Sequence, residues 1–92
     1  MGFKSTENKG FVMTFANGWT ISVQFGYGNY CDNRNHPNGF GFSQKQEITE
    51  SQDAEIAIWD KDGEWYDFGN DQVKAYQTAE EVAEWINKVA SW

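Results

Sequence analysis

The chain of 92 residues has one cysteine, one histidine and one proline. A single cysteine cannot form an internal disulfide bond, and this usage is typical of a reducing compartment. A structural zinc site requires four ligands, usually cysteine or histidine at paired short spacings, and Cys31 and His36 have no second member of either type. Their separation of five residues also fixes no catalytic thiol–imidazole geometry. We therefore expect no metal site and no thiol chemistry.

Long hydrophobic runs and positive charge are also scarce. No apolar run reaches the ~18 residues of a membrane span, and the first ten residues are polar, without the hydrophobic region of a signal peptide. Fourteen acids against seven lysines and arginines give a net charge of −7, which repels phosphate backbones. These features predict an intracellular protein that contacts neither a membrane nor DNA or RNA directly.

Catalytic patterns are missing as well. The sequence shows no carboxylate pair placed for acid–base work, no Ser-His-Asp order and no P-loop. Asp60, Asp62 and Glu64 are spaced like the start of an EF-hand, but Gly63 comes too early and the flanking segments are typical of strands. We expect a protein that is not an enzyme and has no cofactor.

Two hairpins are predicted. The first joins residues 11–16 to 19–25 through Asn17-Gly18, a dipeptide preferred in type I′ turns. In its second run, large apolar residues alternate with Thr20, Ser22 and Gln24, which predicts one buried and one solvated face. The second hairpin joins residues 54–59 to 64–68 through a turn at residues 60–63, with Gly63 at positive φ.

The C-terminal segment predicts a helix. Thr78 is a candidate N-cap, and Glu81 completes a capping box. Four apolar residues at helical spacing form one buried stripe: Val82, Trp85, Ile86 and Val89. The order of two hairpins and a helix predicts a single domain over residues 1–92 of the α+β class. We expect a small two-layer fold, with an antiparallel sheet of about four strands and the helix packed on one face.

Residues 26–42 are the least ordinary part of the chain. They hold four glycines, four asparagines and four aromatic residues, together with the only arginine. Loops of this length in small domains are usually functional or disordered. Aromatic rings can stack on bases, asparagine amides match base edges, and Arg34 can bind a phosphate. The candidate ligand-binding residues are Tyr27, Asn29, Tyr30, Asn33, Arg34, Asn35, His36 and Phe40. The same composition also suits a protein-binding loop or a packed structural loop.

Two further surfaces have a predicted role. Residues 47–71 contain nine acids and one lysine, which indicates either a solvated face or a surface that docks on a basic partner. The strand at residues 11–16 is apolar on both faces, and Trp59 lies opposite Ile56 and Ile58. One helix covers only one face of a sheet, so we expect a homodimer or higher homo-oligomer.

Three segments carry a resemblance that extends over nearly the whole chain. They are GFVMTFANGWTISVQFGYGNYCDN, AEIAIWDKDGEWYDFG and TAEEVAEWINKVAS. Together they resemble a family of small uncharacterised bacteriophage proteins with no established activity or site. The resemblance implies a setting in the cytoplasm of an infected bacterium, where phages use small binding proteins against host defence.

The first hypothesis is therefore a non-enzymatic phage protein that antagonises bacterial host defence. It would sequester a small nucleotide-like signal through residues 26–42. The second hypothesis is an acidic inhibitor that docks on a host defence protein through residues 53–71 and the same loop. A third is a phage accessory or structural protein.

Overall fold

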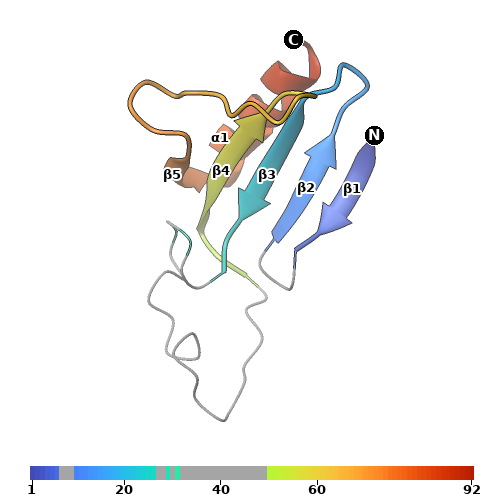
Figure 1. Cartoon of the computed structure of the whole chain (residues 1–92). Helices are drawn as coiled ribbons and strands as arrows, with labels where there is room; N and C mark the ends of the chain where they lie inside the picture. The colour runs from blue at the N-terminus through green and yellow to red at the C-terminus, as the bar shows by residue number, and fades with distance from the viewer. Residues whose placement is uncertain (7–9, 27–28, 30, 32–49) are drawn as a thin grey trace.

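The computed structural model describes residues 1–6, 10–26, 29, 31 and 50–92. Five antiparallel strands form one sheet in sequence order, and one helix lies behind it (Figure 1). The α+β two-layer prediction is confirmed, with five strands in place of about four. The elements are β1 (Gly2–Ser5), β2 (Gly10–Thr14), β3 (Thr20–Gln24), β4 (Asp53–Trp59), β5 (Lys74–Thr78) and α1 (Ala79–Ala90).

The core lies between the sheet and α1. Strand register places Ile21 between Met13 of β2 and Ile58 of β4 on the face that the helix covers. Ile21, Ile56 and Ile58 are fully buried, and Val82 and Val89 of α1 pack against them. The alternation read in residues 19–25 therefore correctly identified the core face.

The helix begins and is oriented as the sequence predicts. Thr78 is the N-cap, its side chain accepts from the Glu81 N–H, and the Glu81 carboxylate accepts from the Thr78 N–H. Twelve residues at about 1.5 Å each span about 18 Å, and α1 packs against β3, β4 and β5. We call β3–β5 the covered half of the sheet, and β1 and β2 the open half.

The opposite face of β3 is not solvated as expected. Thr20 and Ser22 are buried, and both are hydrogen bonded on this face. The Thr14 and Thr20 hydroxyls lie 3.0 Å apart, and the Gln24 amide donates to Ser22 Oγ at 2.9 Å. Neighbouring strands shield these small polar side chains while satisfying their hydrogen bonds.

One strand was missed, and one predicted strand was wrong. Strand β1 was not predicted, because four residues with one large apolar side chain are too short to show alternation. The returning strand at residues 64–68 is reduced to one bridge between Trp65 and Trp59. Tyr66 and Phe68 instead turn their rings toward Trp85 of α1, and β4 pairs with β5.

The first turn is not type I′. Phe15 N–H donates to the Trp19 carbonyl at 2.8 Å, and Gly18 N–H donates to the Phe15 carbonyl at 2.9 Å. Gly18 has φ +91°, whereas Asn17 does not have positive φ, so residues 16–18 form a three-residue loop ending in a left-handed glycine. The turn at residues 60–63 follows the same pattern, and Gly63 has the predicted positive φ of +81°.

Candidate functional site

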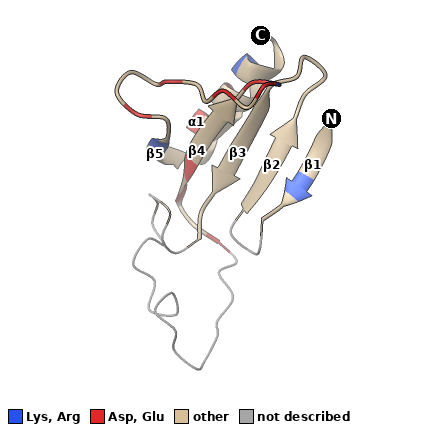
Figure 2. Cartoon of the chain, viewed as in Figure 1, with Lys and Arg blue, Asp and Glu red and all other residues tan. Residues whose placement is uncertain are grey.

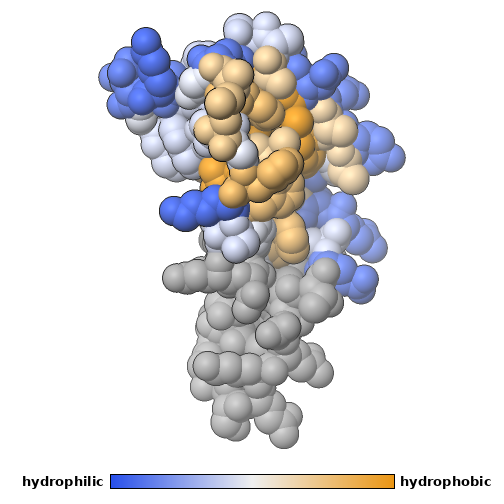
Figure 3. Space-filling view, turned by 90° about the vertical axis from the view of Figure 1, so that its right-hand side faces the viewer, coloured by the Kyte–Doolittle hydropathy of each residue, from blue (hydrophilic) through white to orange (hydrophobic). Residues whose placement is uncertain are grey.

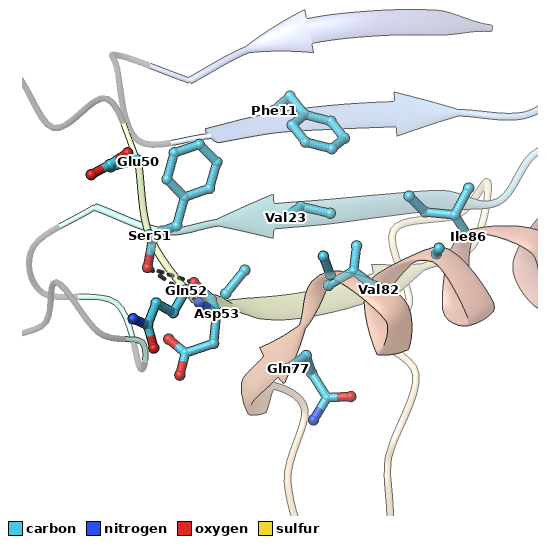
Figure 4. A pocket seen from close by; sticks show the side chains of 13 residues that line it. Phe11, Val23, Glu50, Ser51, Gln52, Asp53, Gln77, Val82 and Ile86 are labelled. Carbon is cyan, nitrogen blue, oxygen red and sulfur yellow. Dashed lines mark hydrogen bonds between the residues drawn. The ribbon is translucent and has the colours of Figure 1, made fainter.

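One hollow among the described residues follows from the short helix. Because α1 packs on β3–β5 and leaves β2 uncovered, the helix-side face of the sheet opens beside Phe11. A pocket lies there between the sheet and the helix (Figure 4). Its sheet side is formed by Phe11 of β2, Val23 of β3 and Phe25, and its opposite side by Val82 and Ile86 of α1. The cavity volume is about 380 Å³.

The rim of this pocket is polar and comes from the start of β4. Residues 50–53 line it, and Ser51 Oγ donates to the Asp53 carbonyl at 2.7 Å while accepting from the Asp53 N–H at 3.4 Å. These bonds hold the segment as it enters the sheet. The pocket therefore has an apolar interior and a rim that offers hydroxyl, amide and carboxylate groups. Two of the rim residues, Glu50 and Asp53, are acids.

Gln77 also lines the pocket, from β5. Only 6% of it is exposed, and its Nε2 donates to the Ala75 carbonyl at 3.2 Å. Within the described part of the chain, Gln77 Oε1 is the one buried side-chain oxygen or nitrogen that has no hydrogen-bond partner. In Figure 4 its amide points away from Phe11 and Val23, beneath the start of the helix. The polar chemistry offered to an occupant thus comes from the rim.

Of the eight predicted ligand-binding residues, only Asn29 is among those that the structure describes. Its Oδ1 accepts from the Gly26 N–H at 3.0 Å, and its Nδ2 donates to Glu55 Oε1 at 3.4 Å. The neighbouring Cys31 is buried, and its thiol donates to the Gly26 carbonyl at 3.5 Å. Both side chains hold a turn against β4. The other seven residues lie outside the described ranges: Tyr27, Tyr30, Asn33, Arg34, Asn35, His36 and Phe40.

The pocket and the predicted loop meet at the same end of the sheet. The loop at residues 26–42 begins directly after Phe25, and the described chain resumes at Glu50, and both of these residues line the pocket. The pocket was missed in the sequence because Phe11, Val23, Val82 and Ile86 have the spacing of ordinary core residues. The length of the helix relative to the width of a five-stranded sheet was the signal that could have found it.

A second surface gathers negative charge. Figure 2 shows the acids along β4, the segment after it and α1, while β1, β2 and β3 carry none. Within this acidic surface Trp65 is 46% exposed, and its ring stacks on Trp59 with 5.3 Å between ring centroids. Exposed tryptophan side chains often anchor protein–protein contacts, where a few aromatic residues supply much of the binding energy.

Among the described residues, no group of three or more histidine, cysteine, aspartate or glutamate side chains could hold a metal ion. The helix that the structure describes is too short to cross a membrane. Comparisons with protein-family models, curated proteins and solved structures found no match. The resemblance to phage proteins therefore stays a prediction.

Proposed function

We propose that the protein is a non-enzymatic binding protein that antagonises bacterial host defence by sequestering a small nucleotide-like signal. The observation that carries the proposal is the pocket of about 380 Å³, which opens where the loop at residues 26–42 leaves the sheet. Small-molecule pockets occupy about 300–1,000 Å³ and are mostly apolar with a few polar groups. This volume is at the lower end, which suits one base with its sugar.

The lining matches both the faces and the edges of a base. The apolar sides formed by Phe11, Val23 and Phe25 would contact the faces of a base, because every base has a flat aromatic surface. The Ser51 hydroxyl and the Gln52 amide at the rim would pair with polar base edges. The carboxylates of Glu50 and Asp53 disfavour phosphates at the rim. The phosphates would therefore lie farther out, and Arg34 is the cation that the sequence predicts for them.

Calorimetric titration with nucleotides, including cyclic ones, tests this function. Ala83 is exposed and lines the pocket, so Ala83→Trp should fill the opening without disturbing the core. We expect Ala83→Trp to abolish binding and Arg34→Ala to weaken it by about 1.5–3 kcal/mol, the range for hydrogen bonds to charged groups. The same tryptophan placed at exposed Ala90, at the other end of the helix, is the matched control and should bind normally.

The second function, an acidic inhibitor of a host defence protein, has its own supporting observation. Trp65 offers an exposed anchor, and three acids within three residues of it in the sequence, Asp62, Glu64 and Asp67, are also exposed. If this function holds, nucleotide titrations stay flat and binding to a basic defence protein is lost in Trp65→Ala. Ala83→Trp then binds normally. Binding would also weaken with added salt, because exposed charges are screened.

A further inference from the structure

We propose that the chain forms a two-fold dimer in which β1 pairs with β1 of a second copy and joins the two sheets. Strand β1 is at one end of the sheet order, with no partner on its outer side among the strands that the structure describes. Such an edge presents unpaired N–H and C=O groups, and another chain can bind to them by continuing the sheet. This surface is separate from the pocket and does not depend on the proposed function.

The other edge of the sheet is poorly suited to the same contact. Strand β5 has a register shift opposite Ala54 and Ile56, and Tyr76 within it has φ +54°. A left-handed non-glycine residue and a bulge both bend an edge away from regular pairing. Strand β1, in contrast, pairs with β2 in unbroken register from Gly2 to Ser5.

The distribution of charge favours β1 as the contact surface between two copies of the chain. The protein has a net charge of −7, so two copies repel each other wherever their acids meet. Lys4 is the only charged side chain of β1 and β2, and Figure 2 shows the acids on the opposite half of the sheet. Pairing through β1 therefore keeps the acids of β4, of the segment after it and of α1 away from the contact.

The ladder of hydrogen bonds fixes which groups face outward. Thr6 N–H donates to the Gly10 carbonyl at 3.1 Å, and antiparallel ladders alternate between hydrogen-bonded and open pairs. Lys4 and Gly2 therefore direct their backbone groups toward β2. Phe3 and Ser5 direct theirs outward, and these are the groups available to a second strand.

In two registers the outward groups of Phe3 pair with an outward residue of the second β1, and charge separates these two registers. In the first, Phe3 lies opposite Phe3 of the second copy, the two residues exchange both hydrogen bonds, and each Lys4 lies opposite a Gly2. In the second, Phe3 lies opposite Ser5, and the two Lys4 side chains meet as a close non-hydrogen-bonded pair. Like charges directly opposite are destabilising, whereas cross-strand aromatic pairs stabilise. The first register is the one we propose.

The Phe3 side chain supports this register. It is 80% exposed and lies on the same face as Met13 of β2. Figure 3 looks at the β1 side of the molecule and shows hydrophobic residues gathered at its centre. Joining two copies would bring the two Phe3 rings together beside this surface. One short strand from each copy makes a small interface, so a weak dimer in the micromolar range is expected.

Sedimentation velocity over a concentration series tests the dimer. We expect the mass to rise from 10.6 kDa toward twice that value. Phe3→Glu places two carboxylates across the two-fold axis and should weaken association at least about 100-fold. Lys4→Glu changes the net charge by more but lies opposite glycine, so it is the matched control and should dimerise like the unaltered chain. A single 10.6 kDa species throughout, or dimers that survive Phe3→Glu, would overturn the proposal.

Cross-linking tests the register. Phe3→Cys should form an intermolecular disulfide under mild oxidation, because paired Cα atoms about 5.5 Å apart suit that bond. Ser5→Cys should not, since the two Ser5 residues would be offset by four residues, about 13 Å. The native Cys31 is buried and contributes little background. Cross-linking only in a mixture of Phe3→Cys with Ser5→Cys would indicate the second register and overturn the first.

Discussion

The two halves of the sheet share one ladder of hydrogen bonds but are stabilised differently. In the covered half, Ile21, Ile56 and Ile58 are fully buried beneath α1. In the open half, every residue of β1 is exposed and every residue of β2 is only half-buried. The helix-side face is apolar across both halves, because Met13 continues the row of Ile21 and Ile58. The two halves differ in whether the helix packs on them. The half beneath α1 contributes most of the buried core, and the other half leaves apolar surface exposed.

Alanine substitutions on either side of Ile21 should give the largest difference in unfolding free energy between the two halves. Ile58→Ala removes a fully buried side chain beneath the helix and should cost about 3–4 kcal/mol. Met13→Ala removes a half-buried one from the same row and should cost about 1 kcal/mol. Urea denaturation of both variants gives the two free energies. Equal losses would mean that both strands are covered in solution, and the contrast between the halves would fail.

A glycine tests how the open half is attached to the covered half. A Cβ built on Gly10 would lie 1.9 Å from the Val23 carbonyl oxygen, and Gly10 has φ +153°. Gly10→Ala must therefore push β2 away from β3, at a cost of about 3 kcal/mol from overpacking. Hydrogen exchange should show the amides of β1 and β2 losing protection while those of β4 keep it.

Gly63→Ala is the control for the backbone strain alone. Gly63 has φ +81°, but a Cβ there would meet nothing within 4 Å. Its cost should be only about 1–2 kcal/mol, the penalty for a left-handed alanine. If Gly10→Ala costs no more than Gly63→Ala, β2 and β3 are not in the close contact that joins the halves.

The sequence predicted the covered half better than the open half, for physical reasons. Alternation in residues 19–25 and 54–59, and the stripe with Thr78 and Glu81, are local signals that report burial under one helix. Strand β1 has no such signal, because its neighbour β2 supplies the pairing and nothing buries it. The pocket likewise depends on how far a helix reaches across a sheet. A hydrophobic pattern assigns a residue to one face of a strand or helix, but it does not show whether another element packs on that face.

Asn17 has a role that the sequence did not predict. Its sequence context predicted a turn residue at positive φ, whereas in the structure its side chain hydrogen bonds to the C-terminal end of the helix. Its Nδ2 donates to the carbonyls of Val89, Ala90 and Trp92 at 2.9–3.2 Å, and its Oδ1 accepts from the Trp19 N–H. The contacts to the helix end span more than 70 positions of the chain, so no local pattern could reveal them.

Asn17 also joins the two layers, and its replacement gives the third test. Asn17→Ala leaves the last carbonyls of α1 without this donor and should cost about 1–2 kcal/mol. Asn17→Asp keeps the acceptor for Trp19 but places a carboxylate against three carbonyls at the negative end of the helix, so it should cost more. Thermal denaturation ranks the two. An aspartate variant as stable as the native chain would show that the amide does not hold the helix end.

The smallest expected effect concerns the first turn of the helix, above β5 in the covered half. The Thr78 N–H donates to Glu81 Oε1 at 2.9 Å, and this bond, with the Thr78 hydroxyl, lowers the pKa of Glu81 below its usual 4.5. A carboxyl whose pKa is lower in the folded state stabilises the fold above the unfolded pKa and loses that contribution as the pH falls through the folded pKa. Glu81→Gln keeps an acceptor for Thr78 but removes the charge. The stability difference between the native chain and Glu81→Gln should therefore be constant above about pH 4.5 and shrink at lower pH. Urea titrations at several pH values measure it, and a difference that stays constant into strong acid would show that the capping box gains nothing from the charge.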